Sequence, residues 1–260
     1  MKQVRFLLFP FAALYYLITS FRNFLFDKKV LKSTSFSIPV IIVGNLSVGG
    51  TGKTPQIEYL IRLLSDTFKI AVLSRGYKRK TKGFFWVHKN ASVDEVGDEP
   101  LQFFKKFKNI HVAVDESRVH GIQQLLENQK PEVVLLDDAF QHRKLKGSFY
   151  ILLTSYANLF VNDFLLPVGN LRESGSGAKR ANTIIITKCP KDLSEKEQQK
   201  IIKKIKPLKN QRVFFTEISY SETVKGNDNM NLQDLVDFEI LLVTGIANPC
   251  LLYTSPSPRD

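Results

Sequence analysis

The sequence is poor in cysteine. Its 260 residues include only Cys189 and Cys250, too few for a disulfide framework or a cysteine-rich metal site. Small proteins of oxidising compartments, which depend on disulfides, carry more of them. We therefore expect a chain that folds around a hydrophobic core in a reducing, cytoplasmic setting.

Acidic residues are scarce relative to basic ones. The chain has 37 Lys and Arg residues against 25 Asp and Glu residues, a formal net charge of +12. This excess favours an anionic partner, which could be nucleic acid, an acidic membrane surface or a phosphorylated substrate. The length and the 43% of hydrophobic residues predict one large α/β domain, alone or with a small second one.

A long uncharged hydrophobic run is missing too. The most apolar segment, Phe6–Phe26, is interrupted by Arg22 and has Pro10 near its start, whereas a membrane-spanning helix needs about 20 apolar residues. The small-residue cleavage site of a secretory signal does not follow it. Its tyrosines and flanking basic residues favour a membrane-associating helix over residues 1–30, lying in the interface. A helix packed on the domain and a spanning helix remain as alternatives.

The most informative motif lies at residues 38–58. Val40–Val43 is typical of a buried strand, a glycine-rich turn follows, and Lys53 and Thr54 open a predicted helix. This order is that of a phosphate-binding loop, in which backbone N–H groups and the helix N-terminus face phosphate oxygens. Ser47 stands where the strict pattern has its first glycine. We predict that ATP binds to Ser47, Val48, Gly49, Gly50, Thr51, Gly52, Lys53 and Thr54, with Lys53 on the phosphates and Thr54 on Mg²⁺.

Strands alternate with helices along most of the chain. The predicted strands are Val40–Val43, Ile70–Leu73, Val112–Val114, Val133–Leu136, Tyr150–Leu153, Thr183–Thr187, Arg212–Phe215 and Ile240–Val243. The predicted helices between them are Thr54–Leu64, Glu99–Phe107, Arg118–Asn128 and Ser194–Ile205. This alternation predicts an α/β fold of the P-loop NTPase type, a mostly parallel sheet flanked by helices. The glycines and serines of Gly169–Ala178 predict a mobile loop.

Acidic pairs occur at two of these element ends. Asp137 and Asp138 follow the run Val133–Leu136, where phosphate-loop enzymes place a carboxylate linked to Mg²⁺. One of them could hold the metal while the other lies near the acceptor. Asp98 and Glu99 open a predicted helix, and spacing alone favours a capping role there over a chemical one.

Further polar clusters surround these acids in the sequence. Gln141 and His142 follow the second pair, and nothing local decides between a functional and a packing role for the histidine. Arg172 and Glu173 are either a solvated pair or an arginine on phosphate charge beside a metal-binding glutamate. The basic run Arg75–Lys82 follows a predicted strand and could meet nucleic acid, an anionic lipid head group or only solvent.

Together these motifs resemble the family of tetraacyldisaccharide 4'-kinases, the lipid A 4'-kinases, from about Val4 to Pro249. Seven blocks in order carry the resemblance: Val43–Pro55, Ser74–Tyr77, Val96–Pro100, Asp137–His142, Leu166–Glu173, Thr187–Pro190 and Thr244–Pro249. The departure at Ser47 is shared with members of this family.

The resemblance implies a specific reaction. ATP, with Mg²⁺, would give its γ-phosphoryl group to the 4'-hydroxyl of a tetraacylated disaccharide 1-phosphate, forming lipid IV-A at the cytoplasmic face of the bacterial inner membrane. It implies catalytic roles for Asp98 as base and for Lys53, Asp138 and Arg172. It also implies metal binding by Thr54, Asp137, Asp138 and Glu173, and substrate binding by Arg75, Tyr77, Gln141 and His142. Nucleic acid is not an expected partner, and the oligomeric state is left open.

The end of the sequence departs from the family pattern. We expect a kinase domain over residues 31–249 that is incomplete at its C-terminus, and a tail over residues 250–260 that resembles the translation of a sequencing adapter. In the family, a later Asp-His-His block supplies a histidine that partners the catalytic aspartate. We therefore expect the natural chain to continue, and the chain as written to phosphorylate weakly or not at all.

Two other functions remain as alternatives. One is a membrane-bound nucleotide switch of the partitioning-ATPase or GTPase type. Val48 stands where partitioning ATPases have a lysine, and Pro190 follows Thr187–Cys189 where GTPases have an acid, so both observations count against it. The other is a basic ATPase that binds RNA or DNA, which rests on the net charge and on Arg75–Lys82 alone.

Overall fold

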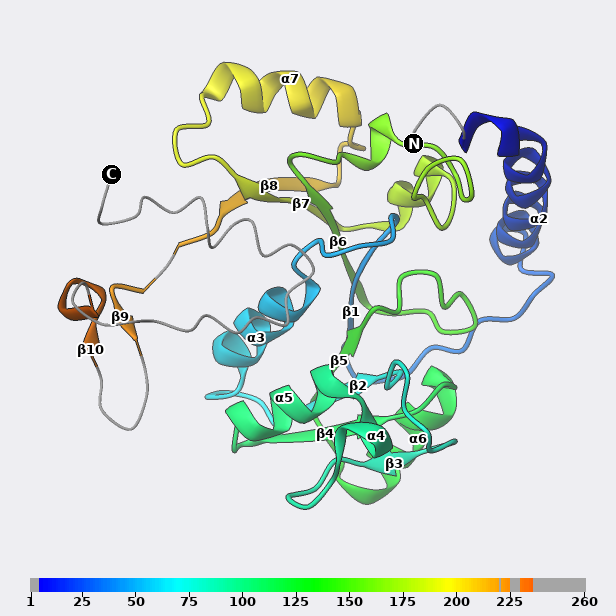
Figure 1. Cartoon of the computed structure of the whole chain (residues 1–260). Helices are drawn as coiled ribbons and strands as arrows, with labels where there is room; N and C mark the ends of the chain where they lie inside the picture. Colours follow the sequence, from blue (N-terminus) through cyan, green and yellow to red (C-terminus); the bar gives the residue numbers. More distant parts are fainter. Residues whose placement is uncertain (1–4, 220, 225–229, 236–260) are drawn as a thin grey trace. The chain divides into compact units, whose positions relative to one another are not determined.

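A computed structural model describes residues 5–219, 221–224 and 230–235 of the chain. It divides the chain into two compact units, Met1–Thr216 and Glu217–Asp260. The first unit contains the large sheet and the labelled helices that surround it in Figure 1. The domain boundaries predicted from the sequence, at residues 30 and 249, stay predictions.

Eight strands form the large sheet. They are β1 (Val40–Asn45), β2 (Ile70–Ser74), β3 (Phe85–Trp86), β4 (Ile110–Val114), β5 (Val133–Asp137), β6 (Phe149–Ser155), β7 (Thr183–Cys189) and β8 (Arg212–Glu217). Their order is β3-β4-β2-β5-β1-β6-β7-β8. The strands from β4 to β7 in this order pair in parallel, and β3 pairs antiparallel with β4. The mostly parallel sheet predicted from the sequence is therefore confirmed.

Helices cover the sheet on both faces (Figure 1). The helices of the first unit are α2 (Phe9–Asp27), preceded by the 3₁₀ turn η1 (Phe6–Leu8), then α3 (Lys53–Leu64), α4 (Val93–Val96), α5 (Asp98–Lys106), α6 (Arg118–Asn128) and α7 (Glu195–Ile205), with short 3₁₀ turns η2 (Phe160–Asn162) and η3 (Gly175–Arg180). Neighbouring residues of a strand face opposite sides of the sheet. Val43 accordingly packs in the cluster that contains Ile57 of α3, and Ile42 packs in the cluster that contains Ile122 of α6.

Parallel pairing brings the carboxyl ends of the central strands to one edge. In the register, Val43 of β1 lies beside Asp137 of β5, and Leu73 of β2 lies beside Leu136. The glycine loop after β1, the acidic pair at the end of β5 and the basic run after β2 therefore share this edge, where open α/β sheets bind their ligands.

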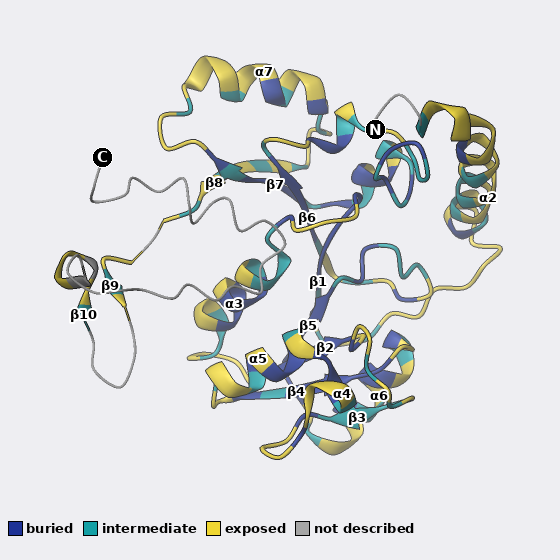
Figure 2. Ribbon diagram, in the orientation of Figure 1, coloured by how far each residue is buried: buried dark blue, intermediate teal, exposed yellow. Residues whose placement is uncertain are grey.

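The N-terminal helix α2 is attached to the first unit by polar bonds. The hydroxyl of Tyr15 donates to the carbonyl oxygen of Arg172 over 2.7 Å, and the side-chain amide of Asn23 donates to the carboxylate of Glu173 over 3.1 Å. The opposite face of η1 and α2 exposes large apolar side chains (Figure 2): Leu7, Phe11, Leu14, Leu17, Ile18, Phe21 and Phe24. Several of these lie three or four residues apart, on one side of the helix. This helix therefore turns its apolar face away from the protein.

One prediction from the sequence needs correction, and three concern residues outside the described ranges. The predicted mobile loop Gly169–Ala178 is packed: its C-terminal half forms η3, and Leu171 bridges to Ser47 of the glycine loop. The predicted strand Ile240–Val243, the block Thr244–Pro249 and the tail 250–260 lie outside the described residues. In the second unit, β9 (Thr223–Val224) pairs antiparallel with β10 (Met230–Asn231), and the 3₁₀ turn η4 (Leu232–Leu235) follows.

The two faces of α3 predict different sensitivities to truncation. Ile61 is fully buried, whereas Leu63 is 59% exposed. We expect Ile61→Ala to lower the free energy of unfolding by about 2–5 kcal/mol, because it opens a cavity in the core. Leu63→Ala on the same helix should change it by less than about 0.5 kcal/mol. Urea denaturation of both variants measures this, and equal losses would contradict the packing described here.

Candidate functional site

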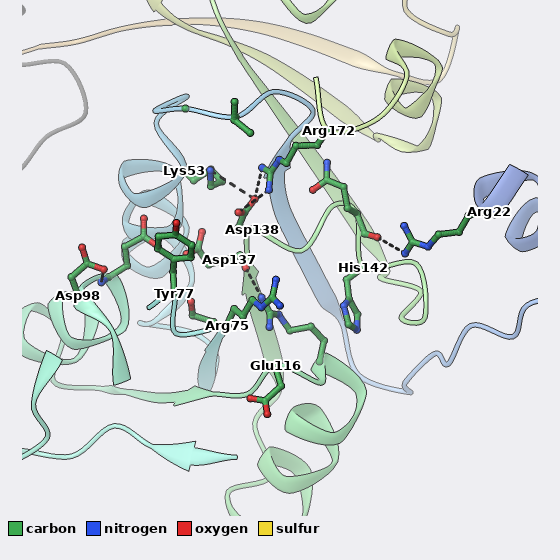
Figure 3. A pocket seen from close by; sticks show the side chains of 16 residues that line it. Arg22, Lys53, Arg75, Tyr77, Asp98, Glu116, Asp137, Asp138, His142 and Arg172 are labelled. Carbon is green, nitrogen blue, oxygen red and sulfur yellow. Dashed lines mark hydrogen bonds and ion pairs between the residues drawn. The ribbon is translucent and has the colours of Figure 1, made fainter. Parts of the chain in front are cut away.

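A cavity of about 700 Å³ opens at the carboxyl edge of β1, β2 and β5 (Figure 3). One end is lined by the glycine loop and the acids after β5, through Val48, Gly49, Lys53, Asp137 and Asp138. The other end is lined by residues that reach it from four separate elements, among them Arg22, Arg75, Tyr77, Arg118 and His142. A phosphate-binding end and a cationic end thus share one space.

The glycine loop has the backbone that its sequence predicts. Gly49 and Gly52 have φ of 115° and 85°, conformations that other residues rarely adopt. Gly52 is the N-cap of α3, so the positive end of that helix dipole faces the loop. Ser47 and Thr51 are buried below the cavity, which places them in the frame of the loop and not on its surface.

Two neighbouring segments hold this loop in place. On one side, the N–H of Val48 donates to the carbonyl oxygen of Asn170 over 2.8 Å. On the other side, the end of β7 reaches the loop carbonyls: the Thr187 hydroxyl donates to Thr51 over 2.9 Å, and the Lys188 ammonium donates to Gly50 over 2.8 Å. The block Thr187–Pro190 therefore supports the loop, a role that the sequence did not suggest.

Asp138 is the centre of a cationic cluster at the mouth of the loop. Arg172 donates two hydrogen bonds to its carboxylate, over 3.0 and 2.7 Å, and the Lys53 ammonium lies 3.8 Å away. Figure 3 shows the two cations converging on this carboxylate. Although burial favours the neutral acid, the hydrogen bonds from Arg172 and the charge of Lys53 lower the pKa of Asp138. Asp138 is therefore ionised and holds both cations where phosphate oxygens would lie.

Asp137 has the opposite electrostatics. Burial, followed by the nearby charges of Glu99 and Asp138, raises its pKa to about 8. Both of its carboxylate oxygens are buried without a hydrogen-bond partner among the described residues. Burying an ionised carboxylate in this way is costly unless a cation pairs with it.

The surroundings of Asp137 suit Mg²⁺. The hydroxyl of Thr54 donates to the carboxylate of Glu99 over 3.1 Å, and Glu99 lies close enough to Asp137 to raise its pKa. In the described part of the chain, no three His, Cys, Asp or Glu side chains form a complete metal cage. Mg²⁺ takes one or two carboxylates and fills its other positions with water and phosphate oxygens, so the carboxylate of Asp137 and the hydroxyl of Thr54 are donors of the kind that it binds.

Asp98 lines the same cavity, at the start of α5. Gly97, with φ of 90°, is the N-cap of that helix, so Asp98 is its first residue and not its cap. The Asp98 carboxylate accepts the N–H of Glu99 over 3.0 Å and remains exposed at the cavity wall. It can therefore receive a proton from a bound hydroxyl group.

The cationic end of the cavity surrounds His142. Burial, followed by the charges of Arg118 and Arg22, lowers the pKa of His142 to about 4, so the ring is neutral at pH 7. The side-chain amide of Gln141 donates to the backbone carbonyl oxygen of Asn45 over 2.7 Å. The backbone carbonyl oxygen of Gln141 accepts a hydrogen bond from the side chain of Arg22. Tyr77 is 70% exposed at the rim.

The basic run Arg75–Lys82 is more ordered than its sequence indicates. Arg79 is ion-paired with Glu116, and Lys80 with Asp94. The backbones of Gly76 and Gly97 pass so closely that a Cβ on Gly97 would lie 3.3 Å from the Cα of Gly76. The loop that carries Arg75 and Tyr77 is therefore packed against the turn that carries Asp98.

The prediction that Glu173 binds the metal is wrong. Its carboxylate is 3% exposed and accepts hydrogen bonds from Arg180 over 2.8 and 2.9 Å and from Asn23. It does not line the cavity. Consecutive side chains diverge where this segment bridges to the glycine loop at Leu171. Arg172 consequently enters the cavity while Glu173 anchors α2.

Sequence reasoning missed several residues of the site. Asn45 lies next to Lys53 and Arg172, Glu99 accepts a hydrogen bond from Thr54 and lies near Asp137, and Arg118 is buried at the cationic end. Asn45 lies in the segment Val43–Pro55 and Glu99 in the segment Val96–Pro100, both of which carry the family resemblance. Considering every polar residue of these segments could have found them. Arg118 begins an ordinary helix, and nothing in its local sequence marks it.

The chain is similar to known proteins over most of its length. The family model described as "Tetraacyldisaccharide-1-P 4'-kinase" matches residues 4–255. Tetraacyldisaccharide 4'-kinase of Flavobacterium johnsoniae is 59% identical over 251 residues, covering 96% of this chain and 74% of that protein. The protein of the same name from Bacteroides thetaiotaomicron is 47% identical, covering 93% of this chain and 67% of that protein.

A solved structure is similar as well. The crystal structure of LpxK from Aquifex aeolicus in complex with ATP has a TM-score of 0.67 and 34% sequence identity to this chain, and the match covers 86% of each. This similar structure is of a complex with ATP. A nucleotide-binding fold is consistent with the glycine loop and the cation cluster described above.

The two aspartates predict opposite effects of pH on stability. Because the folded pKa of Asp137 is raised, the folded chain binds more protons than the unfolded chain between about pH 4 and 8, and stability falls as pH rises through this range. Without Mg²⁺ or ATP, we expect Asp137→Asn to be more stable than the wild type, by a margin that grows by up to roughly 1.4 kcal/mol per pH unit and levels off above pH 8.

Asp138→Asn is the matched control. The folded pKa of Asp138 is lowered, so its carboxylate contributes stability above its unfolded pKa, and the variant should be less stable than the wild type at neutral pH. Urea unfolding at pH 5, 7 and 9 measures both variants. A stability difference for Asp137→Asn that does not change with pH would contradict the burial of an unpartnered carboxylate.

Proposed function

Because the chain belongs to the tetraacyldisaccharide-1-P 4'-kinase family, we propose that it transfers the γ-phosphoryl group of ATP to the 4'-hydroxyl of an acylated disaccharide 1-phosphate. It is a phosphotransferase of lipid A biosynthesis, and ATP is its phosphoryl donor. The roles of its residues rest on one observation. Lys53 and Arg172 meet on Asp138 in a cavity that Asp98 also lines.

The glycine loop and its cations hold the donor. Phosphoryl transfer depends mainly on positioning and on neutralising charge at the oxygens of the moving group. The loop N–H groups bind the phosphates, while Lys53 and Arg172 neutralise the oxygens of the transferred group. The carboxylate of Asp138 orients both cations before the nucleotide binds. The side-chain carbonyl oxygen of Asn45 also accepts a hydrogen bond from each of them. Pre-organised charge of this kind costs little to rearrange during the reaction.

Asp137 and Thr54 would hold Mg²⁺, with Glu99 beside them. The bound ion supplies positive charge to the phosphate oxygens. Its presence would also remove the proton that the raised pKa of Asp137 otherwise retains, since metal ligands bind in their deprotonated form. The two adjacent aspartates therefore divide the work: Asp137 takes the metal and Asp138 orients the cations.

Asp98 acts as the general base. As the acceptor hydroxyl attacks the γ-phosphorus, its proton passes to the exposed carboxylate at the start of α5. Arg75, Tyr77, Gln141 and His142 bind the acceptor at the cationic end. A neutral His142 can donate or accept a hydrogen bond to a sugar hydroxyl without adding a further positive charge to this end.

The membrane is the proposed location of the reaction, at the cytoplasmic face of the inner membrane. None of the helices in the part of the chain that the structure describes is long and apolar enough to cross a bilayer. The apolar outer face of α2 suits a helix that lies in the interface. Arg22 of the same helix lines the reaction cavity. An acylated acceptor that stays in the bilayer could therefore present its head group to the site.

Asp98→Asn tests the assignment of the base. We expect the rate of phosphate transfer from labelled ATP to the acceptor to fall by about 10²–10⁴-fold, the usual contribution of general base catalysis. The affinity for Mg²⁺-ATP should stay unchanged, because Asp98 does not contact the glycine loop. Asp66→Asn, an exposed aspartate after α3, is the control. A variant that keeps its transfer rate would exclude Asp98 as the base.

A second experiment tests the membrane contact. The triple variant Phe11→Ser, Ile18→Ser and Phe21→Ser removes exposed apolar side chains from α2. Since burying one such side chain contributes about 1.5–3 kcal/mol, we expect at least about 100-fold weaker binding to neutral phospholipid vesicles in co-sedimentation. The control replaces Tyr59, Leu63 and Phe68, three large hydrophobic residues that are exposed away from α2, with serine. Equal loss in the two variants would refute a specific role of α2.

A further inference from the structure

A second cavity, of about 640 Å³, lies beside the C-terminal end of α2. We call this cavity the basic cavity. The charged residues that line it are Asp27, Lys29, Lys32, Arg143, Lys146 and Arg180. Five of these six side chains are cationic. The reaction proposed above uses none of these six side chains. The excess of positive over negative charge in this cavity therefore requires another explanation.

Backbone pairing brings the lysines of the basic cavity together from two distant segments. Thr34 forms a parallel β-bridge with Leu145, its N–H donates to Lys144, and the N–H of Lys146 donates back to Thr34. The hydroxyl of Ser33 donates to the carbonyl oxygen of Arg143 over 2.7 Å. These bonds hold the linker after α2 against the loop after β5, which fixes Lys32 and Lys146 on the same wall.

Two of the cations are already neutralised. Arg143 pairs with Asp27 over 2.7 Å, and Arg180 pairs with Glu173 over 2.8 Å. Lys29, Lys32 and Lys146 are exposed and form no ion pair among the described residues. The cavity therefore holds three uncompensated positive charges, and the favoured ligand is an anion.

The position of these charges identifies the anion. Lys29 and Lys32 follow α2 and its exposed apolar face directly, and Val30 and Leu31 between them are exposed as well. Lys146 is held beside this segment by its bond to Thr34. Cations at the end of an interfacial apolar helix face the head groups of the bilayer in which that helix lies. A soluble anion would gain nothing from the adjoining apolar surface, whereas a phospholipid could place its acyl chains along it.

We propose that the basic cavity binds the phosphate head group of an anionic phospholipid of the bilayer through Lys29, Lys32 and Lys146. This site adjoins the acceptor site, since His142 lines both cavities, but its three lysines do not line the reaction cavity. The proposal rests on the proposed contact of α2 with the membrane. Its effect is to orient the protein on the bilayer: α2 supplies apolar attraction, and the basic cavity fixes which end of the helix faces the anionic lipid.

The experiment compares vesicles of phosphatidylcholine alone with vesicles of phosphatidylcholine mixed with phosphatidylglycerol, using the whole chain. The triple variant Lys29→Gln, Lys32→Gln and Lys146→Gln should bind the mixed vesicles about 10- to 100-fold more weakly than the wild type. Its binding to phosphatidylcholine alone should not change. The difference should disappear at an ionic strength of about 1 M, where the Debye length is only about 3 Å.

Two matched variants control for charge and for folding. Lys200→Gln, Lys203→Gln and Lys204→Gln on α7 change the net charge equally, away from the basic cavity, and should keep the preference for the mixed vesicles. Replacing the three cavity lysines with arginine should keep it too. If the α7 variant loses the preference as strongly as the cavity variant, the attraction belongs to the net charge and the proposal is wrong.

Two further outcomes separate this proposal from others. If the glutamine variant at the cavity also binds the acylated disaccharide 1-phosphate more weakly in neutral detergent micelles, the cavity holds a phosphate of the acceptor and not a bilayer lipid, which overturns the proposal. If neither the wild type nor the variant binds phosphatidylcholine alone, but the preference for phosphatidylglycerol persists, then the apolar contact of α2 fails while the lipid site stands.

Discussion

The parallel pairing of β1 with β5 is the constraint on which the site depends. It places the last residues of β1 beside Asp137, so that the glycine loop and the two aspartates leave the sheet side by side. A shift of this register by one residue would exchange the faces of β5 and move its acids away from the loop. The register is held by the two buried faces of the sheet, which are packed against α3 and α6. The reaction chemistry thus depends on ordinary hydrophobic packing.

The pKa values of the two acids at the end of β5 differ because their burial and their neighbouring charges differ. Asp137 and Asp138 are adjacent in sequence, yet the pKa of the first is raised to about 8 and that of the second is lowered. Asp138 has a positive φ of 48°, an uncommon conformation for a residue with a side chain. This turn of the backbone directs its carboxylate toward Lys53 and Arg172 and leaves Asp137 in the sheet, facing Glu99. One strand end therefore supplies two acids with different proton affinities, as the proposed roles of metal ligand and cation anchor require.

Most of the sheet and much of the site could be predicted from the sequence, because both rest on local patterns. Within the residues that the structure describes, the apolar runs predicted their strands to within a few residues, and the helix Arg118–Asn128 was predicted with its observed bounds. The glycine loop and the acidic strand end are motifs whose chemistry is local. What could not be predicted depends on tertiary placement. Glu99 becomes useful only because α5 packs beside Thr54, and Glu173 fails as a ligand because Arg180, seven residues later, folds back onto it.

The N-terminal helix shows how the acceptor end of the site and the proposed membrane contact are joined. An amphipathic helix on a water-soluble protein normally buries its apolar face, whereas α2 exposes that face and is attached through Tyr15, Asn23 and Arg22. These bonds end on Arg172, Glu173 and Gln141, which belong to the site or adjoin it. A helix attached in this way cannot change its position without disturbing Arg172 and Gln141. Where the bilayer fixes α2, it therefore also fixes the cavity in which the acceptor must be bound.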